Sequence, residues 1–219
     1  MPADTVVLAV AIALVLVALA LAVIGLGTLW WIGVQLLMLP GIVVHEFAHK
    51  RACDLVGVPV LEVAYFRFGD PSGYVRHVQP ERYRQSFVIS VAPFLVNTIV
   101  SLAVFFGFAV LVTTVTESPV SFELLADLET VSSDVLVLAA VLGWLGIAVG
   151  MQAFPSTGDA NTLWARSRAE WRRSPIVLVG VPVVLVIYVA NLLSWLWADV
   201  LYAVGLAVIA FYAVGLLLP

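Results

Sequence analysis

The sequence predicts an all-α integral membrane protein with six transmembrane helices and a small β-hairpin between the second and third. Of its 219 residues, 63% are hydrophobic and only 11% are charged. A soluble domain is nearer half apolar and a quarter charged, so this composition excludes an ordinary soluble protein. The apolar residues also fall into runs of about 20, the length that crosses roughly 30 Å of hydrocarbon as a helix. We therefore expect one integral membrane domain over residues 1–219.

The six apolar runs are justified one by one along the chain. No basic residue precedes the first run and no clear cleavage site follows it, which favours a retained helix over a signal peptide. A Gly25-Leu26-Gly27 turn is expected to separate this helix from the second. The fourth contains Gly143, Gly146 and Gly150, whose spacing permits close helix packing. The predicted transmembrane helices are residues 5–24, 28–51, 85–115, 135–154, 175–197 and 200–217.

Residues 61–78 differ from these runs and predict a membrane-associated β-hairpin. The stretches 61–68 and 74–78 are rich in β-branched and aromatic residues, and they flank a strong turn signal at 69–73. The open edge of such a hairpin is a place where an extended peptide can add by backbone hydrogen bonds.

The segment His45-Glu46-Phe47-Ala48-His49 forms an H-E-x-x-H motif near the end of the second predicted helix. Residues four apart lie on one face of a helix, so the two imidazoles can bind one metal ion while Glu46 reaches a water beside it. This pattern indicates a zinc site with its general base. Two buried histidines bonded to neighbouring helices are the alternative, but ionisable groups in a membrane are costly and usually functional. We expect one Zn²⁺ here.

A catalytic zinc ion usually has three protein ligands, and Asp159 is the favoured third one. It follows the helix break at Pro155, on the same side of the membrane as the two histidines, and Gly158 lets the chain turn toward them. The alternative role for Asp159 is to cap the helix that follows.

Other candidates for the third ligand come from the region just after the motif. His77 is the only further histidine, and its alternative roles are a surface residue or a substrate contact. Cys53 lies four residues beyond His49, where a packed thiol is favoured over a ligand. Asp54 and Glu62 are further candidates for the third ligand because they lie near the H-E-x-x-H motif in the sequence.

The basic residues predict the orientation. With six crossings, all ten lie in two connecting segments that share one side with both termini, and the opposite loops have none. By the positive-inside rule this side is cytoplasmic, so we expect a multi-pass cell-membrane protein with cytoplasmic N- and C-termini. No basic tract indicates a nucleic-acid partner. The ten are Lys50, Arg51, Arg67, Arg76, Arg82, Arg84, Arg166, Arg168, Arg172 and Arg173.

Three motifs in order resemble the site-2 protease family of intramembrane zinc metalloproteases. The H-E-x-x-H motif is followed by Ala92-Pro93-Phe94-Leu95-Val96-Asn97 and then by Gln152-Ala153-Phe154-Pro155 through Asp159. The family pattern is H-E-x-x-H, then G-P-x-x-N, then N-x-x-P and L-D-G. Ala92, Gln152 and Gly158-Asp159-Ala160 depart from that pattern. The resemblance implies a divergent, minimal core without a PDZ domain.

By position, the resemblance implies that His45, His49 and Asp159 are zinc ligands and Glu46 is the base. Asn97 would contact the substrate carbonyl or the developing oxyanion. The implied function is a zinc-dependent endopeptidase that cuts transmembrane protein substrates near the cytoplasmic side, in regulated intramembrane proteolysis within the lipid bilayer. The alternative is a non-proteolytic zinc-binding membrane protein: a carrier, a sensor or a pseudoprotease. A carrier should show polar residues at several depths of its helices. The oligomeric state is left open.

Overall fold

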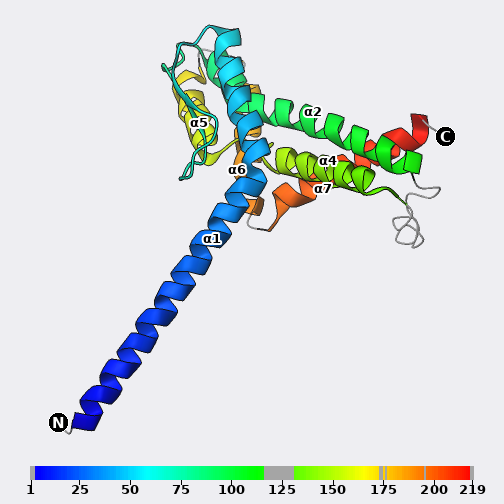
Figure 1. The fold of residues 1–219 in the computed structure, drawn as a ribbon. Helices are drawn as coiled ribbons and strands as arrows, with labels where there is room; N and C mark the ends of the chain where they lie inside the picture. The colour runs from blue at the N-terminus through cyan, green and yellow to red at the C-terminus, as the bar shows by residue number, and fades with distance from the viewer. Residues whose placement is uncertain (1–2, 116–130, 173–174, 176, 195, 218–219) are drawn as a thin grey trace. The chain divides into compact units, whose positions relative to one another are not determined.

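The computed structural model describes residues 3–115, 131–172, 175, 177–194 and 196–217 (Figure 1). Within these residues, five helices are long and apolar enough to cross a membrane, and one two-stranded sheet is present. The expected helical fold with a hairpin is therefore found in outline. The elements in chain order are α1 (Ala3–Val56), β1 (Val60–Ala64), β2 (Tyr74–His77), α2 (Tyr83–Val115), α4 (Ser133–Met151), α5 (Thr157–Glu170), α6 (Val177–Ser194) and α7 (Ala198–Leu217).

The predicted turn at Gly25–Gly27 is wrong, because α1 continues through it as one helix of 54 residues. Isolated glycines inside a helix cost only about 1 kcal/mol each relative to alanine, and no proline accompanies these two. The six predicted transmembrane helices are therefore not confirmed. The expected cytoplasmic placement of the termini depended on six crossings, and it stays a prediction.

The chain divides into two units, Met1–Leu37 and Met38–Pro219. The first unit consists of the N-terminal part of α1, which is mostly apolar in its described residues. The second unit contains the rest of α1, the hairpin and the other helices of the described residues. All of the predicted site residues belong to this second unit, while the expectation of a single domain stays a prediction.

The predicted hairpin is confirmed. Strands β1 and β2 pair antiparallel, with Val60 opposite His77 and Ala64 opposite Tyr74. Val60 also packs on a small core in which the Cys53 side chain is fully buried beside Ile89 of α2. Cys53 is thus a packed thiol, as the sequence favoured, and this core attaches the hairpin to α1 and α2.

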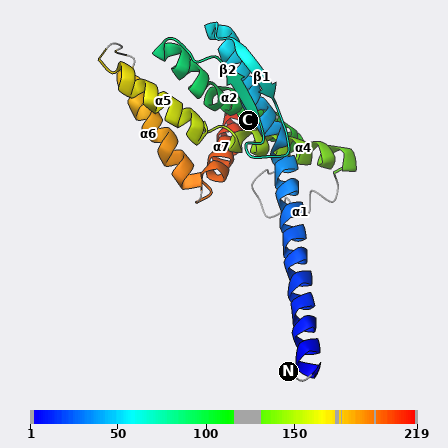
Figure 2. The ribbon, with the colours of Figure 1, turned by 90° about the vertical axis from the view of Figure 1, so that its left-hand side faces the viewer.

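Helices α2, α4 and α7 pack side by side, and α5 packs along α6 (Figures 1 and 2). The glycines of α4 allow part of this packing. A Cβ on Gly146 would lie 2.6 Å from the buried ring of Phe105, and one on Gly150 would lie 2.9 Å from Ala203. At Gly143 the nearest atom, in Phe108, would be at an ordinary 3.8 Å. The predicted close packing is confirmed at the first two positions.

Gly146→Ala is expected to lower the free energy of unfolding by about 1–3 kcal/mol relative to Gly143→Ala, because only the first places a methyl group inside a filled contact. Both variants replace glycine by alanine in the same helix, so the gain in helix propensity cancels. Thermal unfolding in detergent, followed by circular dichroism, measures the difference. Equal midpoints for the two variants would contradict the close packing of α4.

Candidate metal centre

His45 and His49 lie one turn apart on α1 and present their rings to the same side. The ring centroids are 4.9 Å apart, and only 7% of His45 and 8% of His49 is exposed. The expectation that the two imidazoles share a face is therefore met. Two buried polar rings must also find hydrogen-bond partners, since an unpaired polar group in an apolar interior is costly.

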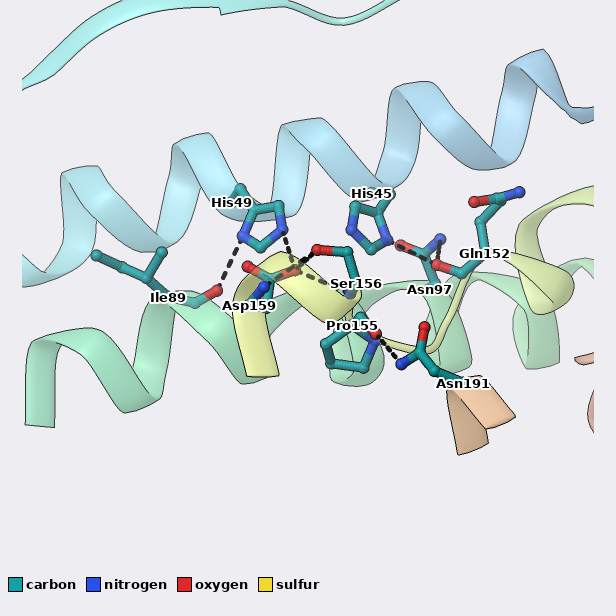
Figure 3. Close-up of polar contacts among 9 residues, drawn as sticks. All are labelled: His45, His49, Ile89, Asn97, Gln152, Pro155, Ser156, Asp159 and Asn191. Atoms are coloured by element: carbon teal, nitrogen blue, oxygen red, sulfur yellow. Dashed lines mark hydrogen bonds and ion pairs between the residues drawn. The ribbon is translucent and has the colours of Figure 1, made fainter. Parts of the chain in front are cut away.

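Each ring uses its Nδ1 to donate a hydrogen bond to a backbone carbonyl (Figure 3). His45 Nδ1 lies 2.7 Å from the Gln152 oxygen, and His49 Nδ1 lies 3.0 Å from the Ile89 oxygen. A carbonyl can only accept, so both rings carry a proton on Nδ1, and Nε2 is the nitrogen that each ring can offer to a metal ion. Histidines that bind metals in proteins are oriented in this way by the other ring nitrogen.

The two carbonyls are free for different reasons. Gln152 follows the last residue of α4, so no helical N–H takes its oxygen. Ile89 lies inside α2, but the residue four positions later is Pro93, which has no N–H to donate. The proline thus leaves a buried carbonyl on α2 that His49 satisfies.

Asp159 enters from the first turn of α5. Its Oδ2 lies 3.5 Å from His49 Nε2 and accepts hydrogen bonds from the Ser156 hydroxyl at 2.6 Å and the Ser156 N–H at 2.9 Å. Ser156 is the N-cap, and its Oγ accepts from the Asp159 N–H in return, which completes a capping box. Capping and approach to the histidines, which were alternatives in the sequence, are therefore combined in one side chain.

The Asp159 carboxylate is ionised at neutral pH. Burial alone would raise its pKa, but the hydrogen bond and charge of His49, together with the Ser156 hydroxyl, lower the pKa to about 2. An ionised carboxylate is the form that binds a cation.

In the described part of the chain, His45, His49 and Asp159 form a group that can hold a metal ion. Their ligand atoms all lie within 4.8 Å of one another. Ligands at the zinc distances of about 2.0–2.1 Å are roughly 3.4 Å apart in a tetrahedron, close to the 3.5 Å between His49 and Asp159. Two imidazoles and a carboxylate also suit such an ion chemically.

The other candidates from the sequence do not join this group. His77 lines a cavity beside the histidines, but it is not among the residues whose ligand atoms come together. Asp54 pairs with Lys50 at 2.6 Å, and Glu62 pairs with Arg76 at 3.0 Å. Both carboxylates are thereby committed to surface ion pairs.

Glu46 lines two adjoining cavities of about 360 and 340 Å³, both of which also contain His45. The turn of the hairpin covers this place. A Cβ on Gly73 would lie 2.7 Å from Glu46 Cγ, so only glycine allows the turn to come this close. The arrangement gives Glu46 a partly enclosed space in which it faces the same cavity as the histidines.

Asn97 lies behind His45 and lines neither of these cavities. It is fully buried, and its Nδ2 lies 3.0–3.3 Å from the carbonyl oxygens of Gly41, Val149 and Gln152. It therefore supports the same Gln152 carbonyl that orients His45 and links α1, α2 and α4. The predicted contact of Asn97 with a substrate stays a prediction.

Sequence reasoning did not identify Ser156 or the two carbonyls as parts of the site. The spacing Ser156-x-x-Asp159 is a capping-box signal that could have identified the serine. The place of Pro93, four residues after Ile89, could have indicated a free carbonyl. Which histidine would use it depends on the packing of α1 against α2, which the sequence does not display.

Neither the protein-family models, nor the curated proteins, nor the solved structures contain a match to this chain. The description of the site therefore depends on its own geometry.

Asp159→Ala is expected to lower the zinc affinity at least 10–100-fold, the loss seen even for partners outside the ligand set, because it removes the only carboxylate of the group. His77→Ala is expected to keep one zinc ion per chain. Metal content after gel filtration in detergent, measured by atomic emission, distinguishes them. Loss of zinc in the His77 variant alone would reassign the third ligand.

Pro93→Ala returns an N–H to position 93, where it competes with His49 for the Ile89 carbonyl. Its zinc affinity is expected to fall about 10–100-fold, as for other partners that orient a metal-binding histidine. Pro182→Ala makes the same exchange within α6 and serves as the control. Titration against a chromophoric chelator gives both affinities. An unchanged affinity in Pro93→Ala would show that this carbonyl does not orient His49.

Proposed function

We propose that this chain is a zinc-dependent intramembrane endopeptidase that hydrolyses transmembrane protein substrates near the cytoplasmic side. The observation that carries the proposal is the position of Glu46, which lines the same cavities as His45, beside the group formed with His49 and Asp159. A metal site used only for structure has no need of an acid–base residue facing open space beside it.

His45, His49 and Asp159 would hold the zinc ion, which when bound polarises the scissile carbonyl and lowers the pKa of water. The Glu46 carboxylate accepts a proton from the attacking water and later gives it to the nitrogen of the leaving segment. The Nδ1 bonds to Gln152 and Ile89 orient both rings, and their Nε2 atoms would be the nitrogens that hold the ion. Glu46 and the ligands therefore have separate tasks.

An apolar cavity supports a hydrophobic substrate. It has a volume of about 340 Å³ and is lined by apolar residues of α2 and α6 together with Phe154 and Pro155. Phe154 also lines the larger of the cavities that contain Glu46. A polypeptide that passes Glu46 can therefore place an apolar side chain beyond Phe154, as a transmembrane segment would.

One feature of α2 bears on the alternative of a zinc carrier. Ser86, Ser90, Asn97 and Ser101 are buried at several depths of this helix, as a transport path would require. Asn97 and Ser101, however, donate to backbone carbonyls of neighbouring helices, with Ser101 Oγ 2.8 Å from the Gly146 oxygen. Groups used in this way join helices and line no open path. Zinc flux into liposomes containing the purified chain would support the carrier instead.

Glu46→Gln is expected to abolish cleavage, with a rate loss of at least about 10²–10⁴-fold, while zinc content stays at the wild-type level. Membranes from cells that produce wild type, Glu46→Gln or the control Glu81→Gln are compared by mass spectrometry for new peptide N-termini inside transmembrane segments. Such termini should appear with wild type and the control only. The same termini from Glu46→Gln would exclude this mechanism, and a zinc-loaded wild type that yields none would favour a pseudoprotease or sensor.

A further inference from the structure

The third ligand of the metal group depends on a short segment between α4 and α5. Ser156 holds the Asp159 carboxylate through its hydroxyl at 2.6 Å and its N–H at 2.9 Å. The position of Asp159 therefore follows the position of Ser156. The residue before Ser156 is Pro155, which has no N–H of its own with which to anchor the backbone.

Pro155 is held through its carbonyl by a residue of α6. Asn191 Nδ2 donates to the Pro155 oxygen at 2.9 Å (Figure 3). It also donates to the Ile187 oxygen of its own helix at 2.8 Å. The bond to Ile187 fixes the orientation of the Asn191 amide. The bond to Pro155 then holds the segment between α4 and α5 at this amide. The connection thus runs from α6 through Pro155 and Ser156 to Asp159.

Asn191 is unusual for its helix. The rest of α6 is almost entirely apolar, and a polar side chain in a membrane helix is costly unless it is bonded. Asn191 also lines the cavity that contains His45 and Glu46. The position of Asn191 at this cavity therefore indicates a role at the site in addition to helix packing.

We propose that Asn191 is a positioning residue for the metal centre: by holding the Pro155 carbonyl it sets where α5 begins and where Asp159 meets His49. The role rests on the metal-binding part of the proposed function and does not require proteolysis. Residues that orient metal ligands typically change metal affinity 10–100-fold when they are replaced.

The test compares Asn191→Leu, which keeps a similar volume but removes the donor, with Tyr188→Phe. Tyr188 lies one turn earlier on α6 and donates to the Asn161 side chain of α5 at 2.6 Å, so its variant also removes one α5–α6 hydrogen bond but leaves the Pro155 carbonyl held. The full-length proteins in detergent are titrated with Zn²⁺ against a chelator and with Co²⁺, whose visible spectrum reports the ligand geometry.

Asn191→Leu should bind Zn²⁺ about 10–100-fold more weakly and shift the Co²⁺ spectrum, while Tyr188→Phe should match wild type. Wild-type affinity and spectrum in Asn191→Leu would overturn the positioning role, and so would equal losses in both variants, which would indicate general packing. If Asn191→Leu does not fold, Asn191→Ala provides the same comparison, and loss of folded protein in both would show that Asn191 maintains the fold instead. A wild type that binds neither ion would overturn the metal site itself, and this proposal with it.

Discussion

Two backbone carbonyl oxygens, those of Gln152 and Ile89, hold the histidine pair in place. A carbonyl without a partner in an apolar interior is costly, and so is an imidazole N–H. Pairing each carbonyl with one Nδ1–H satisfies both groups and leaves Nε2 as the ring nitrogen that can bind a metal ion. Because one carbonyl belongs to α2 and the other follows α4, the metal group forms only when α1 packs against both helices. Asn97 strengthens this arrangement by donating to the Gln152 oxygen as well.

Asp159 combines two local roles. Asp159 completes the capping box of α5 with Ser156 while it approaches His49, so one carboxylate both begins a helix and faces the histidines. The free N–H groups and the positive end of the helix dipole favour a negative charge at this place. The hydrogen bonds from Ser156 orient the carboxylate, and the start of a helix is a rigid support for it.

The polar groups of this apolar protein gather where the helices must be joined. Asn97, Ser101 and Asn191 each donate to a backbone carbonyl of another segment. Between membrane helices apolar contact gives little preference for one neighbour, so hydrogen bonds and close contacts at small residues determine the packing. Gly146 and Gly150 of α4 provide such close contacts with α2 and α7. These hydrogen bonds and close contacts join the helices that surround the partly open cavity at Glu46.

The sequence by itself determined that the chain forms long apolar helices, that a hairpin follows α1, and that His45 and His49 share one face of a helix. Hydrophobic runs, turn signals and helical spacing are local properties, so the sequence displays them directly. It did not determine that α1 continues past Gly25, since isolated glycines permit a helix as well as a turn. Only the tertiary structure groups Asp159, and not His77, with the two histidines, since both lie far from His49 along the chain. It also placed Asn97 behind His45 and connected Asn191 to Pro155. Those contacts join separate helices, and no spacing along the chain encodes them.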